Sequence, residues 1–313
     1  LKIQADYFSE KREGIFLERA SLPLYIGVST KPYVNVGKMK NHGFDTSLEY
    51  NQRVGQVRLS GKANFTYAHN TIIDNDQPDW KYPYLNRRGQ MLWQQYGLVA
   101  AGLFESQADI DSWPTQTFGE VKPGDIKYID INGDGKIDTN DEKPIGWAAV
   151  PEIVYGFGLS AAWKGLDCSV FFQGAGHVTL QQSGSAIQAF SARNMMESGV
   201  YEDIYYNHWS EDNPNPNAKY PRLSIGSNKN NFRNSTFWQK DMSYLRLKTV
   251  EIGYNFPSKW IDPIHISGLR IYLSGVNLLT FSKFKLWDPE VLEGQGANYP
   301  ATRIFNFGIN INL

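Results

Sequence analysis

The sequence has one cysteine, no long apolar run and almost no net charge, and each of these features limits the class of protein. Cys168 has no second cysteine with which to form an internal disulfide, so cysteine usage does not indicate a compartment. No run of about 18 apolar residues is present, which excludes a transmembrane helix. Asp and Glu total 32 against 31 Lys and Arg, and no basic cluster gives the footprint of a nucleic-acid-binding protein.

What the sequence does contain is a repeated alternation of apolar and polar residues. In residues 305–313 every odd position is apolar, from Phe305 to Leu313, and the positions between them are Asn or Gly. Successive side chains of a strand point to opposite faces, so this stretch predicts a strand with one apolar and one polar face. The same alternation predicts strands at residues 1–8, 44–50, 57–67, 153–163, 166–174, 243–256 and 269–273. In residues 243–256 the phase changes near Thr249, which predicts a β-bulge.

The connections between these eight predicted strands are alternately long and short. Residues 9–42, 68–150 and 175–239 are long and mostly irregular, with one strand-like piece at 96–104, and a loop of about twenty residues precedes the last strand. Residues 51–56, 164–165 and 257–268 are the shorter connections. In an up-and-down sheet all the long connections then lie at one end, which is typical of transmembrane β-barrels. The pattern leaves open a secreted, calcium-binding β-sandwich that binds glycans.

Charged residues keep to the face opposite the apolar one, as Asp45, Glu49, Arg58, Lys62 and Arg270 show. A wide, water-filled barrel accepts such charges in its lumen, whereas an eight-stranded barrel fills its interior with side chains. We therefore predict an all-β fold in which residues 1–313 form an arc of about eight antiparallel strands in a larger barrel. Because alternation is already present at Leu1, we expect the sequence to be part of a larger protein.

A twelve-residue stretch, 130–141, has the spacing of a calcium-binding loop. It places oxygen ligands at positions 1, 3, 5, 9 and 12, has Gly135 at position 6 for the turn, and offers a backbone carbonyl at position 7. The predicted metal ligands are Asp130, Asn132, Asp134, Lys136, Asp138 and Asp141. Asp141 replaces the usual glutamate, and Ile137 would anchor the loop in apolar packing. We predict a structural Ca²⁺ site in a long exposed loop, with a solvated acidic turn as the alternative.

No other motif indicates an enzyme or a cofactor site. Residues 156–161 match a dinucleotide-binding fingerprint, but they continue the strand alternation instead of opening a helix, which favours small residues on a lumen face. The five histidines are scattered, and His177 and His208 lie in long loops. Cys168 falls on the apolar phase of its strand. The loop tryptophans either contact a ligand or hold their own loops; they are Trp80, Trp93, Trp113, Trp209 and Trp287.

Several blocks of the sequence together resemble one known family. The longest runs from Pro123-Gly124-Asp125 through Asp141 and is followed by Pro144-Ile145-Gly146. The others are residues 5–8, 35–44, 166–174, 220–223, 243–248, 275–280 and 288–290. These blocks resemble SusC/RagA-type TonB-dependent transporters, and the resemblance extends over essentially the whole chain. One departure is Arg87-Arg88-Gly89, which leaves the charge of a substrate open.

The resemblance implies an outer-membrane barrel of about 22 strands in a Gram-negative bacterium, of which residues 1–313 would be the C-terminal part. The family imports oligosaccharides or peptides, with a SusD-like surface lipoprotein as a lid and with energy from TonB. The plug and the segment that contacts TonB lie N-terminal in the family and are absent from this sequence. Long loops would then be extracellular, and membrane lipid would contact the apolar face. Substrate-contacting residues are not predicted.

Overall fold

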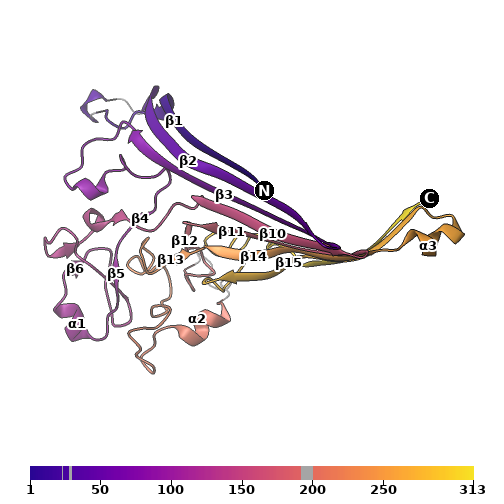
Figure 1. Ribbon diagram of the computed structural model, residues 1–313. Coiled ribbons are helices and arrows are strands. Elements are labelled where there is room, and N and C mark those ends of the chain that lie inside the picture. Colours follow the sequence, from indigo (N-terminus) through magenta and orange to yellow (C-terminus); the bar gives the residue numbers. More distant parts are fainter. Residues whose placement is uncertain (23, 28–29, 192–199) are drawn as a thin grey trace.

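The computed structural model describes residues 1–22, 24–27, 30–191 and 200–313, and its main feature is one curved antiparallel sheet of eight strands (Figure 1). The order across the sheet follows the order along the chain, so the topology is up-and-down. The first and last of these strands form opposite edges, and the sheet is therefore an open arc. Its strands are β1 (Lys2–Glu18), β2 (Tyr33–Val54), β3 (Val57–Asp74), β10 (Ile153–Trp163), β11 (Leu166–Gly176), β14 (Tyr244–Asn255), β15 (Gly268–Ser282) and β16 (Ile304–Asn312).

The predicted antiparallel β fold, the eight strands and the alternation of loop lengths are confirmed. β10 and β11 are joined by Lys164 and Gly165, both with positive φ (47° and 90°), the conformation that suits a two-residue hairpin turn. The predicted bulge is also confirmed, because the pairing of β14 with β15 shifts between Leu247 and Thr249. In Figure 1 the long loops gather at one end of the sheet, and α3 (Ser258–Ile261), from a shorter connection, lies at the other.

The prediction that residues 9–42 are irregular is wrong over much of its length. β1 continues to Glu18 and β2 begins at Tyr33, with pairs such as Lys11↔Lys40 and Leu17↔Val34. Ladder hydrogen bonds use backbone groups alone, and residues 9–13 expose charged or polar side chains on both faces, so no alternation marks this part of the strand. β3 and β15 likewise extend beyond their predicted ends at residues 67 and 273.

The two faces of the sheet differ as predicted. Large apolar side chains on the outer face are exposed, including Leu159 (67%), Leu273 (62%) and Phe307 (65%), and Leu273 lies opposite Phe307 in the β15–β16 register. The inner face carries the charged and small residues of the same strands. Because the eight long strands form a single sheet and the outer face is exposed, the arrangement does not match two sheets packed as a sandwich.

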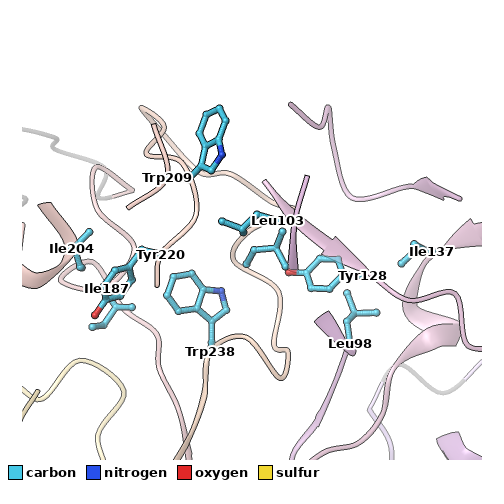
Figure 2. Close-up of a cluster of buried hydrophobic side chains, with 10 residues drawn as sticks. Leu98, Leu103, Tyr128, Ile137, Ile187, Ile204, Trp209, Tyr220 and Trp238 are labelled. Carbon is cyan, nitrogen blue, oxygen red and sulfur yellow. The ribbon is translucent and has the colours of Figure 1, made fainter. Parts of the chain in front are cut away.

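The buried core lies in the loops instead of against the sheet. A cluster of ten buried residues joins the two longest connections, and Figure 2 shows Tyr128, Tyr220 and Trp238 among them. Short elements frame this loop layer. They are η1 (Leu24–Ile26), η2 (Pro83–Leu85), β4 (Tyr96–Gly97), β5 (Ala100–Leu103), α1 (Gln107–Asp111), β6 (Thr115–Gln116), β7 (Ile126–Tyr128), β8 (Lys136–Ile137), η3 (Thr139–Asp141), β9 (Lys143–Pro144), β12 (Thr179–Gln181), α2 (Glu202–Asn207), β13 (Gln239–Asp241) and η5 (Asp262–Ile264). The strand-like piece predicted at residues 96–104 is thus two short strands, β4 and β5, in separate sheets.

Candidate functional site

The inner face of the sheet is polar and is shaped by small residues. Gly156 and Gly158 of β10 face the ring of Phe171, and a Cβ at either position would lie within 3.0 Å of that ring. The ammonium of Lys62 lies 5.1 Å from the centre of the same ring. The glycines of the apparent dinucleotide fingerprint therefore make room for an inward aromatic side chain, which confirms that they are small residues within a strand.

A charged cluster lies on the inner face near the short turns. The guanidinium of Arg270 on β15 donates to Asp167 of β11 at 2.5 Å and to Glu251 of β14 at 2.7 Å. These three side chains come from adjacent strands, so each charge has its partner across the ladder. The inner face thus combines paired charges with small and polar side chains.

Two other ion pairs hold the loop layer together, and they join blocks that the sequence alone left separate. The fully buried carboxylate of Asp125 accepts hydrogen bonds from Arg222 (3.0 Å), Asn228 (3.1 Å) and Asn231 (2.8 Å). Those partners lie about a hundred residues further along the chain, and no local periodicity predicts their contact.

The second pair connects the sheet to the last long loop. Arg246 of β14 is 1% exposed and contacts Asp288 at 2.5 Å and Glu290 at 3.0 Å. A buried guanidinium needs such partners, because an unpaired charge inside a protein is costly. The blocks 243–248 and 288–290 are therefore two halves of one contact.

The predicted calcium loop is held by hydrogen bonds from its own backbone. The two oxygens of Asp130 accept from the amides of Gly133 (2.7 Å) and Gly135 (2.9 Å). The buried carboxylate of Asp141 accepts from Ile131 and Asp138, both at 2.8 Å. The carboxylates at positions 1 and 12 thus fold the loop, and Ile137 is buried in the core cluster as predicted.

The donor types of this loop fit Ca²⁺. The carbonyls of Gly135 and Ile137 accept from Thr115 and Thr117, so the carbonyl of Lys136 between them points the opposite way. Each oxygen of Asp130 accepts one of the two hydrogen bonds that it can take, which leaves acceptor capacity. Within residues 1–22, 24–27, 30–191 and 200–313, however, no group of three or more His, Cys, Asp or Glu side chains is arranged to hold a metal ion. The calcium site stays a prediction.

The predicted loop aromatics divide into two groups. Trp209 is in the buried core cluster, the indole of Trp113 donates to the carbonyl of Tyr128 at 2.7 Å, and that of Trp287 donates to the carbonyl of Val291 at 3.1 Å. Trp113 and Trp287 thus hold their own loops, whereas Trp209 packs in the core that joins the two longest loops. Trp80 and Trp93 are instead exposed, at 51% and 66%.

Of the two loop histidines, His177 lies in a cluster that the sequence analysis missed. The carboxylate of Glu152, 4% exposed, lies 3.0 Å from a ring nitrogen of His177 and 2.5 Å from one of His69. His177 also stacks on Trp147, with the ring centres 3.9 Å apart.

The other loop histidine, His208, lies against the carbonyls of Ile204 and Tyr205 in α2. Cys168 is exposed on the outer face, as its phase predicts.

Lys240 is a further residue that sequence reasoning missed. Its ammonium donates to the carbonyl of Phe237 at 3.0 Å, and among the described residues it makes no ion pair with a carboxylate. Burial, with a smaller contribution from the charge of Lys219, lowers the pKa of Lys240 to about 8. Lys240 lies in β13, whose three residues are all polar, so the sequence gives no sign of this environment.

Comparison with known proteins finds relatives that match the chain over essentially its whole length. No family model matches the sequence. TonB-dependent receptors P3 and P26 of Formosa agariphila are each 28% identical to the chain, over 100% and 99% of its length. The chain covers 32% of the length of each receptor. TonB-dependent receptor SusC of Bacteroides thetaiotaomicron is 23% identical over 95% of the chain, and 29% of it is covered. The chain thus spans about a third of the length of the curated relatives that it matches.

Solved structures show the same fold. The RagAB peptide importer in its open-open state superposes with a TM-score of 0.73 at 22% identity, covering 99% of this chain and 32% of that one. A second structure of the RagAB peptide transporter gives a TM-score of 0.72 at 23% identity. No helix among the described residues is both long and apolar enough to cross a membrane.

The chain is therefore similar to TonB-dependent receptors over its whole length. The similarity to SusC in sequence and to the RagAB structures in fold confirms the SusC/RagA resemblance seen in the sequence blocks.

Proposed function

We propose that the protein containing this chain is a TonB-dependent importer of nutrients in the outer membrane of a Gram-negative bacterium. The observation that carries the proposal is the eight-stranded arc with an exposed apolar outer face, a polar inner face and long loops at one end. An outer-membrane barrel needs this division, because lipid contacts its outside and water its inside. The similar proteins are receptors or importers by name, and we propose no catalytic role.

The whole protein would supply what this chain does not contain. We propose that residues 1–313 form the C-terminal part of a barrel of about 22 strands, with the plug and the TonB-contacting segment in preceding sequence. A SusD-like lipoprotein would cover the long loops, and the substrate would be an oligosaccharide or a peptide. Supporting this assignment, one relative is named SusC and the solved neighbours are titled as the RagAB peptide importer.

The test is purification of the full-length protein in detergent, with and without a co-expressed SusD-like surface lipoprotein. We expect a detergent-dependent complex that retains an oligosaccharide or a peptide, identified by mass spectrometry. Deleting the gene should also abolish growth on that nutrient. A protein that stays soluble and monomeric without detergent would contradict the barrel assignment.

We also propose that residues 130–141 hold a structural Ca²⁺ ion, since their donor types and spacing suit that cation. Asp130, Asp134, Asp138, the amide oxygen of Asn132 and the carbonyl of Lys136 would provide ligands, with Asp141 at the twelfth position. When bound, the ion would neutralise the acidic loop and fix its turn.

Removal of calcium tests this second proposal. At a free Ca²⁺ concentration about 100 times Kd, the folded protein should gain about 2.7 kcal/mol over the EGTA-treated protein, seen as a higher unfolding temperature. Asp130→Ala should abolish the gain and the bound calcium found by elemental analysis. Asp212→Ala, an exposed loop carboxylate outside the motif, is the control and should change neither. Equal calcium content in the wild type and Asp130→Ala would exclude this loop as the site.

A further inference from the structure

A cavity of about 360 Å³ lies between the inner face of the first three strands and the segment that follows β3. Ile15, Leu17 and Met39 line it from the sheet, and Met91, Trp93 and Tyr96 line it from the loop. Its volume falls within the range of small-molecule sites. A cavity of roughly 150 Å³ already binds benzene, so this one has room for a large apolar side chain.

The wall formed by the loop is fixed to the sheet. The amides of Gly89 and Leu92 donate to the carbonyl of Ile72 (2.7 Å) and the side-chain oxygen of Asn70 (2.7 Å) on β3. In addition, the hydroxyl of Tyr96 donates to the carbonyl of Asn86 at 2.8 Å. The hydrogen bonds of Gly89 and Leu92 set the distance of the loop from β3, and that of Tyr96 fixes the loop internally. The cavity is therefore preformed.

Trp93 is unusual in two respects. Its φ is 59°, the left-handed region that a bulky side chain rarely adopts, and its side chain is 66% exposed although it lines an apolar cavity. Such a conformation costs on the order of 1–3 kcal/mol and is enriched at active sites, ligand-binding sites and switch regions. Within the described part of residues 1–313 no core buries the indole to offset that cost. The ring is positioned where a ligand entering the cavity would cover it.

The rim of the cavity offers a positive charge next to the apolar wall. The guanidinium of Arg87 lies 4.2 Å from the centre of the Tyr96 ring, which holds it beside the opening. Among the described residues no carboxylate lies within ion-pairing distance of Arg87 or of Lys38, which also lines the cavity. The carboxylates of Glu18 and Asp74 are at the rim as well, but Asp74 is engaged by the amide of Asp76 (3.1 Å) and by Arg88 (4.0 Å).

We propose that this cavity binds the C-terminal residue of a peptide, with an apolar side chain inside it against Trp93 and the terminal carboxylate on Arg87. Methionine and aromatic walls suit aliphatic and aromatic groups of varied shape, and they offer few partners to the many hydroxyls of a sugar. The inference rests on the proposed import function and narrows its substrate class to peptides. It assigns a binding role to Arg87 and Trp93.

The experiment uses the full-length protein in detergent and a pool of acetyl-Ala-Ala-X tripeptides, in which X is each of the twenty amino acids. Retained peptides are quantified by mass spectrometry, alongside the same pool with amidated C-termini and a pool of maltotriose, cellotriose and xylotriose. We expect enrichment of X = Leu, Ile, Met and Phe with a free carboxylate, and not of their amides.

Two variants test the assigned contacts. Arg87→Gln should lower retention about tenfold, the factor that corresponds to one charge-assisted hydrogen bond. Trp93→Gly should lower it without lowering the unfolding temperature, because glycine adopts a positive φ freely. Matched controls are Arg53→Gln, an exposed arginine on β2 outside the cavity, and Trp80→Ala, an exposed loop tryptophan that does not line it.

Several results would overturn the inference. They are equal retention of acids and amides, no preference for apolar X, retention of the oligosaccharides alone, and retention unchanged in both cavity variants. None of these contradicts the import function, which is judged separately by detergent dependence and by growth of the deletion strain. If those two tests failed, the import function would be wrong, and the peptide inference would lose the basis on which it rests.

Discussion

At the scale of single residues, the loop layer depends on how each buried charge is balanced. Asp125 and Arg246 are each paired with oppositely charged side chains from distant parts of the chain. Lys240 has only a carbonyl oxygen, from Phe237, among the described residues, and its charged form is disfavoured by burial. Because the folded-state pKa of about 8 lies below the ordinary 10.5, the unfolded chain binds more protons between these two values. Charged Lys240 therefore opposes folding below pH 8, and this opposition disappears as the pH rises to 10.5.

Replacement of Lys240 should reveal that pH dependence. Lys240→Met should raise the unfolding temperature at pH 7, and the difference from the wild type should shrink steadily from pH 8 to pH 10.5. The measurement is thermal unfolding of the full-length protein in detergent at a series of pH values. Lys229→Met, at an exposed position in the same loop, should have little effect at any pH. A stabilisation by Lys240→Met that is the same at pH 7 and pH 10.5 would show that the ammonium is not the cause.

At the scale of elements, one glycine allows two long loops to meet. Gly124 has a φ of 83°, and a Cβ there would overlap the ring of Trp209, which lies more than eighty residues further along the chain. The turn also brings Asp125 toward Arg222. A single position thus serves the backbone turn, the aromatic contact and the ion pair, which explains why glycine precedes the aspartate in this block.

Gly124→Ala should separate these loops. The left-handed conformation alone costs an alanine about 1–2 kcal/mol, and displacement of the Trp209 ring adds to it. We expect faster hydrogen exchange in residues 122–128 and 207–222 and a lower unfolding temperature. Gly119→Ala is the matched control, because Gly119 has no positive φ and its added Cβ would meet nothing within 4 Å. Equal behaviour of the two variants would rule out the close contact at Gly124.

At the scale of the whole molecule, the protein buries its core in the loops and leaves the apolar outer face of its sheet uncovered. That face needs an apolar environment outside the chain. An exposed apolar face of this extent on eight strands would promote aggregation in water. In a bilayer the same face is stabilised by lipid, and the buried loop core keeps the long loops ordered above it. The same substitution should therefore be much more costly on the outer face of a strand than on its inner face.

Neighbouring residues of β16 offer that comparison. Phe307→Arg places a charge on the outer face and should cost about 2–4 kcal/mol if it lies near the middle of the bilayer. Asn306→Arg, one residue away on the inner face, should cost little. The measurement is the amount of folded, heat-modifiable full-length protein in purified outer membranes. Equal amounts of the two variants would contradict the assignment of the faces.

The sequence by itself determined the strands and their faces, because a strand repeats every two residues and a lipid or core face selects apolar side chains at that period. It identified all eight strands, the bulge of β14 and the separation of long from short loops. It failed where side chains carry no pattern, as in residues 9–18 and 33–42, because the ladder there needs only backbone groups.

Only the tertiary structure decided which loop residues meet. Several contacts join segments that lie far apart along the chain, where no local pattern relates them. They are Asp125 with Arg222, Arg246 with Asp288, and Glu152 with His69 and His177. The cavity beside Trp93 likewise exists because a loop returns to the inner face of β3 and is hydrogen-bonded there. Local periodicity reports the environment of a residue's own strand, whereas a binding site depends on the path of the chain between strands.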